Sequence, residues 1–120
     1  MSGIVGTSSS KSKVIGRSQD TAKAWVNFNA YSFGERDSFN VSSLVDGANE
    51  IHKINFSSAM ANANYCHVAV TDGGASSHIR FCQTSAVTTT YLEIKGKRTD
   101  GSVTLIDWAS EYNNVVIFGD

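Results

Sequence analysis

Proline is absent from the 120 residues, and neither sign of charge dominates. Ten Lys plus Arg stand against eleven Asp plus Glu, so the net charge is -1 at pH 7. Such a balance builds no basic surface to neutralise phosphates, which argues against nucleic acid as a partner. No apolar run approaches the roughly 20 residues of a membrane span, so we expect no membrane insertion. The sequence therefore excludes two large classes of function before any motif is considered.

The chain also lacks the spacings of common catalytic, metal and nucleotide sites. It contains neither GxSxG nor a phosphate loop ending in GK[ST]. The three histidines occur singly, without the HxH or HxxxH spacing of metal ligands: His52, His67 and His78. We predict no catalytic residue, no metal and no cofactor, and a protein that is not an enzyme. A small hydrolase that uses Glu111 is the last-ranked alternative.

Two cysteines, Cys66 and Cys82, complete the list of scarce residues. Their separation excludes the CxxC motifs of zinc and redox sites. If they lie on neighbouring strands facing one core, a disulfide is feasible at a Cα separation of about 4.4–6.8 Å. The first fifteen residues lack a secretory signal, so we expect synthesis in a reducing cytosol and favour two free, buried thiols. His67 beside Cys66 makes no catalytic dyad, because adjacent strand residues point to opposite faces.

What the chain does contain is a series of short strands separated by turns. In residues 24–29, Val26 and Phe28 alternate with polar residues at period two, as in a half-buried strand. The same reasoning predicts a strand over 37–46 with Phe39, Val41 and Val45 on one face. Further strands are expected over 51–56, 65–71, 78–83, 87–95, 103–108 and 114–118. This pattern predicts an all-β fold, a single antiparallel β-sandwich that is jelly-roll-like.

Residues 1–23 differ in character from the rest of the chain. They are rich in serine, threonine and glycine, and their hydrophobic groups form two short pairs, Ile4-Val5 and Val14-Ile15. This is too little apolar surface to fold alone. We predict an extended N-terminal attachment arm over 1–23 that orders on another surface, followed by one β domain over 24–120. A disordered tail is the alternative.

Candidate contact residues are aromatic or basic. Trp25 falls on the strand face opposite Val26, so we expect it to pack on another element or, as a subunit interface, on another chain. Loop residues of the types that dominate binding are the candidates for receptor or ligand contact: Tyr31, Phe33, Arg36, Trp108 and Tyr112. The alternative for these residues is an ordinary set of exposed aromatics.

Residues 24–29 (AWVNFN) followed by 36–43 (RDSFNVSS) resemble a module of tail-fibre and related virion proteins of tailed bacteriophages. Residues 51–56 (IHKINF) and 59–65 (AMANANY) resemble its later parts. The start MSGIVG and the ending VVIFGD look like those of small fibre-like virion proteins of marine phages. Two departures are a shorter turn between the second and third strands and Ala61, where a proline usually follows the methionine.

The resemblance implies a β-sandwich knob that commonly assembles as a homotrimer, with its N-terminus docked into the virion and no catalytic residues. It predicts a structural protein, a short fibre or fibre-like appendage subunit, made in the host cytoplasm and located in the virion. Its partners would be itself, other tail or capsid proteins, and a host-surface glycan or protein. A stand-alone, lectin-like glycan-binding module for host recognition, using Trp108 and Tyr112, is the alternative from a different class.

Overall fold

The computed structural model describes residues 3–5, 13–15, 22–71, 80–99, 105–107 and 110–119, with the strands at 3–5, 13–15 and 105–107 described by their backbone alone. Apart from one 3-10 turn, η2 (Ala48–Glu50), every element in these ranges is a β-strand. No helix among them is long and apolar enough to cross a membrane. The predicted all-β fold is confirmed.

The first sheet has four antiparallel strands in the order β4-β3-β11-β7. The strands are β3 (Ala22–Asn29), β4 (Gly34–Phe39), β7 (Cys66–Thr71) and β11 (Asn113–Phe118). β4 is an edge strand with three consecutive exposed charged residues, 35–37. A β-bulge between Asn27 and Phe28 also interrupts its pairing with β3. Both features are typical of edges that do not pair further.

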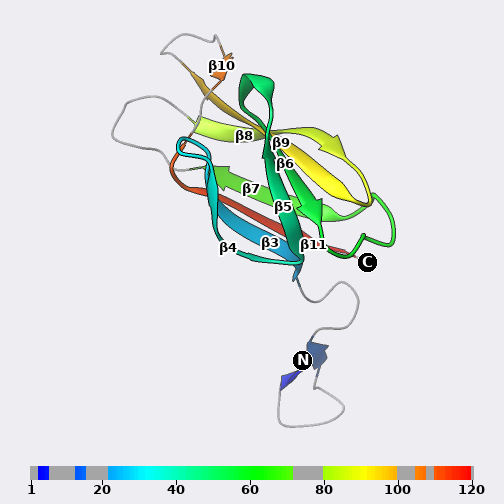
Figure 1. The fold of residues 1–120 in the computed structure, drawn as a ribbon. Coiled ribbons are helices and arrows are strands. Elements are labelled where there is room, and N and C mark those ends of the chain that lie inside the picture. Colours follow the sequence, from blue (N-terminus) through cyan, green and yellow to red (C-terminus); the bar gives the residue numbers. More distant parts are fainter. Residues whose placement is uncertain are drawn as a thin grey trace.

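The second sheet is built around β9 (Tyr91–Thr99). One side of β9 pairs with β8 (Arg80–Val87). The other side pairs first with β6 (Ile51–Phe56) and then with β10 (Leu105–Asp107), and β5 (Val41–Asp46) lies beyond β6. Figure 1 shows this layer stacked on the first sheet. The arrangement is the predicted β-sandwich.

The core lies between the two sheets, because alternate residues of the central strands point inward. β3 contributes Ala24, Val26 and Phe28, and these side chains are buried while their neighbours along the strand are half-exposed. The facing layer and β11 contribute further buried apolar residues: Ile54, Phe56, Leu92, Ile94, Val115 and Ile117. Fully burying a side chain of this kind contributes about 1.5–3 kcal/mol. The period-two pattern of residues 24–29 thus identifies its core face correctly.

The chain passes from the first sheet to the second at Asn40, which has a left-handed φ of 55°. This corrects the prediction of one strand over 37–46. Phe39 is exposed on the first sheet, Val41 packs against the core, and Val45 is exposed on the second sheet. A left-handed residue redirects the strand, so the period-two alternation does not continue across it.

A second correction concerns the predicted strand over 87–95. The Thr88 hydroxyl accepts hydrogen bonds from the backbone N–H of Thr90 at 3.2 Å and of Tyr91 at 3.0 Å. These bonds close a turn between β8 and β9, so Val87 ends β8 while β9 continues through Gly96 to Thr99. Threonine favours strands by propensity, but its hydroxyl also forms such local turns.

The N-terminal segment contains a hairpin. β1 (Gly3–Val5) pairs antiparallel with β2 (Lys13–Ile15), with Ile4 opposite Val14. The chain therefore folds back on itself where an extended arm was predicted, and β3 of the sandwich begins at Ala22. The side chains of Ile4, Val5, Val14 and Ile15 lie outside what the structure describes. An isolated two-stranded hairpin is marginally stable in water, so an arm that orders on another surface stays a prediction.

Candidate interaction surfaces

The outer face of the first sheet, which points away from the core, carries an apolar row across all four strands. Trp25 is the central residue of this row, as its position opposite Val26 predicts. Pairing places Phe39 beside Trp25 on one side and Val116 beside it on the other, and Val68 follows Val116. Phe39 is 53 % exposed and Val68 50 % exposed. We refer to this surface as the apolar face.

The apolar face is hollowed along β11. A groove of about 360 Å³ is lined by Trp25 on the β3 side and by Val68 and Val70 on the β7 side. Asn114 and Val116 of the intervening strand β11 also line it. Val70 is 56 % exposed, so the β7 side forms a protruding apolar ridge beside the groove. An exposed apolar surface with this relief marks a candidate binding site.

One polar pair interrupts the apolar face. The Asn27 side-chain amide donates a 2.5 Å hydrogen bond to Oδ1 of Asn114 on the neighbouring strand. Oδ1 of Asn27 is buried and has no hydrogen-bond partner among the described residues. Asp37, the partner of Asn27 on β4, is exposed and adds a negative charge to this end of the face. The face thus has an apolar centre with polar groups toward one end.

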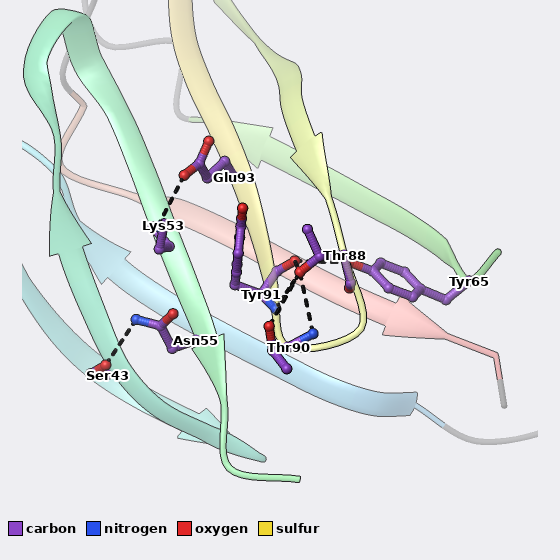
Figure 2. Close-up of polar contacts among 8 residues, drawn as sticks. All are labelled: Ser43, Lys53, Asn55, Tyr65, Thr88, Thr90, Tyr91 and Glu93. Carbon is purple, nitrogen blue, oxygen red and sulfur yellow. Dashed lines mark hydrogen bonds and ion pairs between the residues drawn. The ribbon is translucent and has the colours of Figure 1, made fainter. Parts of the chain in front are cut away.

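The outer face of the second sheet has a different character. Lys53 lies 3.4 Å from the Glu93 carboxylate, and its Nζ lies 4.3 Å from the centre of the Tyr91 ring. Asn55 donates a 3.0 Å hydrogen bond to the Ser43 hydroxyl on the adjacent strand. Figure 2 shows these polar pairs side by side across β5, β6 and β9. This face is suited to contact with water.

One end of the sandwich brings together the loop 30–33 and residues 110–112. The Asn29 side chain accepts hydrogen bonds from the N–H groups of Tyr31 and Ser32, and the N–H of Ala30 donates to the Ser110 carbonyl at 2.9 Å. Ser110 is in turn hydrogen-bonded to Thr71 and to Asn113. These bonds fix the loop to the end of β11.

Two of the predicted contact residues meet at this end. Arg36 donates a hydrogen bond to the Glu111 carbonyl, and its guanidinium carbon lies 4.1 Å from the centre of the Tyr112 ring. Tyr112 is half-exposed, and Tyr31 on the adjoining loop is 78 % exposed. The sequence separation of Arg36 and Tyr112 gives no sign of this contact. Trp108, the predicted neighbour of Tyr112, lies outside the described residues.

Phe33 differs from the other predicted contact residues because it faces a core histidine. Its ring stacks on His52 with 5.8 Å between ring centres, while Phe28 meets the same imidazole edge-on at 5.5 Å. His52 is 2 % exposed, and its Nδ1 lies 3.5 Å from the Asp46 carboxylate. Burial lowers the pKa of His52, and the nearby Asp46 carboxylate partly offsets this effect. His52 is therefore a neutral core residue at pH 7.

The two cysteines occupy different environments. Both are free; Cys66 is exposed on the outer side of β7, next to Phe118, whereas Cys82 packs against the core. This corrects the prediction that both thiols are buried, because Cys66 is exposed. Burial raises the pKa of Cys82 to about 11, so its thiol is inert at neutral pH. His67, which follows Cys66 on β7, points inward instead. Its Nε2 lies 2.8 Å from the Thr84 hydroxyl on β8.

The described residues form no metal site, and the chain has no match among known proteins. Within the described ranges, no group of three or more His, Cys, Asp or Glu side chains is placed to hold a metal ion. Comparison of the chain with protein-family models, curated proteins and solved structures found no match. The features that bear on function are therefore the outer surfaces of the two sheets and the loop end of the sandwich.

Sequence analysis identified Trp25 on the apolar face but missed Val68, Val70 and Val116 as surface residues. A signal was present in β11, where residues 115–118 read Val-Val-Ile-Phe and are apolar at both phases of the strand. Such continuous runs are typical of strands covered on both faces. In this chain the core covers one face of β11, where Val115 and Ile117 lie, and Val116 lies on the other.

Proposed function

We propose that this protein is a structural subunit of a tailed-bacteriophage particle, a short fibre or fibre-like appendage that assembles as a homotrimer. The observation that carries self-assembly is the contrast between the two outer faces of the sandwich. One is apolar and grooved around Trp25, and the other presents Lys53 paired with Glu93. An exposed, grooved apolar face of this kind marks an interaction site.

The virion role is supported by the phage-like motifs at residues 24–29, 36–43 and 59–65, and the first two of these motifs pair as neighbouring strands of the first sheet. Asn40 of the second motif exchanges hydrogen bonds with Ser58, which directly precedes the third motif. Trp25 of the first motif is the cross-strand partner of Phe39. The motifs thus supply both the corner and the centre of the apolar face.

Two experiments test this proposal, the first its self-assembly and the second the role of the N-terminal arm. Sedimentation or light scattering should give a mass near three times the 12.9 kDa of one chain. A single-chain mass at micromolar concentration would contradict the assembly. Removal of residues 1–20 should preserve the trimer and prevent incorporation into particles, because the arm rather than the sandwich attaches to the virion. Loss of the trimer in this truncation would contradict that division.

A glycan-binding module is the second candidate, and the loop end of the sandwich favours it. Tyr31 and Tyr112 present exposed rings there, and Arg36 adds a cation with hydrogen-bond donors. One face of Tyr112 is already covered by the guanidinium, which leaves Tyr31 as the freer stacking platform. A glycan array on the intact protein tests this function. Binding that is lost in Tyr31→Ala and retained in Trp25→Ala would favour recognition at this end.

A further inference from the structure

The apolar face carries its ridge and its groove next to each other. Val68 and Val70 form the ridge on β7, and the groove of about 360 Å³ runs over β11 between that ridge and Trp25. Both are apolar. When a protrusion and a matching hollow lie on one surface, a second copy of the chain can fill the hollow with its own protrusion.

The strand under the groove has the composition of a covered strand. β11 is the second of the two central strands of its sheet, and its outward residue Val116 lies between Trp25 and Val68. Apolar residues at both phases of a strand are typical of burial on both faces. The core accounts for Val115 and Ile117. Val116 lies on the other face, over which the described part of the chain places no further layer.

The apolar face has the character of the centre of a specific interface. Its Phe39, Val68 and Val70 side chains are each about half-exposed, and contiguous exposed apolar surface of this kind marks an interaction site. A standard interface covers about 800 Å² per partner, of which roughly 56–65 % is apolar. The Asn27–Asn114 pair and Asp37 at one end of the face provide part of the polar remainder.

We infer that the apolar face is the contact surface between copies of this chain, with the Val68–Val70 ridge of one copy seated in the Trp25–Val116 groove of the next. This inference depends on the self-assembly proposed above and identifies its surface and geometry. Three such contacts close a ring when each copy offers its ridge to one neighbour and its groove to the other.

The second sheet supplies a matched control for testing this surface. Val70 on β7 and Val45 on β5 are both valines in strands, 56 % and 47 % exposed, on opposite outer faces. Val70→Asp and Val45→Asp therefore place the same charge at equivalent exposure. Val70→Asp should weaken association at least about 100-fold, because a carboxylate would be left without a partner inside the interface. Val45→Asp should assemble like the wild type.

Mass measured against concentration distinguishes the outcomes, and circular dichroism checks that each variant is folded. Equal association of the two aspartate variants in a trimeric wild type would overturn the surface while leaving self-assembly intact. A wild type that remains a single chain would instead contradict the proposed assembly. If Val70→Asp fails to fold, Val70→Thr and Val70→Ile replace it. Threonine should weaken association and isoleucine should preserve it, and the same affinity for both would again overturn the surface.

Discussion

Asn40 and Ser58 exchange two hydrogen bonds at the corner where the chain leaves one sheet for the other. The Asn40 amide donates to the Ser58 carbonyl at 3.1 Å, and its Oδ1 accepts from the Ser58 N–H at 2.7 Å. The same amide donates to the Lys23 carbonyl at 3.0 Å. One side chain therefore ties the start of β3, the β4–β5 corner and the segment after β6.

Replacing Asn40 should be costly because the residue combines these bonds with a left-handed backbone. We expect Asn40→Ala to lower the free energy of unfolding by about 1–3 kcal/mol. Asn49→Ala, which alters another left-handed asparagine (φ 58°) in η2, should cost only the backbone part. Urea denaturation of both variants measures the difference. Equal losses in the two variants would show that the corner bonds contribute nothing.

Tyr65 secures the β8–β9 turn from the opposite layer. Its buried hydroxyl donates toward the carbonyls of Thr88 at 3.0 Å and Tyr91 at 3.3 Å. Figure 2 shows the ring pointing at this turn. Tyr65→Phe should cost about 1 kcal/mol by thermal or chemical denaturation. Tyr91→Phe, which keeps its ring beside Lys53, should change stability by less than about 0.5 kcal/mol, and a reversed order would contradict this account.

The two cysteines should differ strongly in reactivity. With its pKa raised to about 11, Cys82 is almost entirely a thiol at neutral pH and also packs against the core. Cys66 is exposed at the margin of the apolar face. The Val70→Asp variant suits this measurement because we expect its apolar face to stay uncovered. In it, iodoacetamide should label Cys66 at least about tenfold faster than Cys82. Peptide mass spectrometry separates the two sites, and a Cys66→Ser variant should lose the fast label.

Stability should fall as the pH is lowered through the ordinary pKa of histidine. Burial lowers the pKa of His52, so below about pH 6.5 the unfolded chain takes up a proton that the folded chain does not. Each such group removes up to about 1.4 kcal/mol per pH unit until the folded pKa is reached. The lowered pKa of the half-buried His67 adds to the fall in the same direction.

His52→Leu should flatten this pH dependence between pH 7.5 and 5, as measured by urea denaturation at each pH. Asp46→Asn should instead extend the fall to lower pH, because the Asp46 carboxylate is the group that raises the His52 pKa. A His52→Leu protein with the wild-type slope would assign the effect to other groups.

Sequence patterns predicted the strands wherever the outer and inner phases differ in polarity. Residues 24–29 and 51–56 alternate in this way and lie in β3 and β6, respectively. The same pattern failed at Asn40 and at Thr88, because a left-handed residue and a hydroxyl-closed turn are local events that hydrophobic period does not register. At both residues the side chain is hydrogen-bonded to the backbone, and such bonds follow no periodicity in the sequence.

The candidate surfaces were only partly predictable for a different reason. Trp25 is recognisable because it is a large apolar residue on a polar phase of its strand. Val68 and Val70 are not, since they belong to the more apolar phase of residues 66–71, which the alternation assigns to the core and which the structure turns outward. Which phase faces inward depends on how β7 pairs with β11, and that contact between distant residues is set by the whole sheet.

The charged edge strand β4 limits the addition of further copies to the first sheet. Strand-by-strand addition at β4 would place the charged residues 35–37 of one chain against a new backbone and would have to bridge the bulge at Asn27 and Phe28. Open-ended polymerisation by strand addition to the first sheet is therefore disfavoured. In the proposed trimer, copies that meet through their faces use up those faces when the ring closes. A particle built with this proposed subunit would then receive subunits of fixed stoichiometry rather than filaments of variable length.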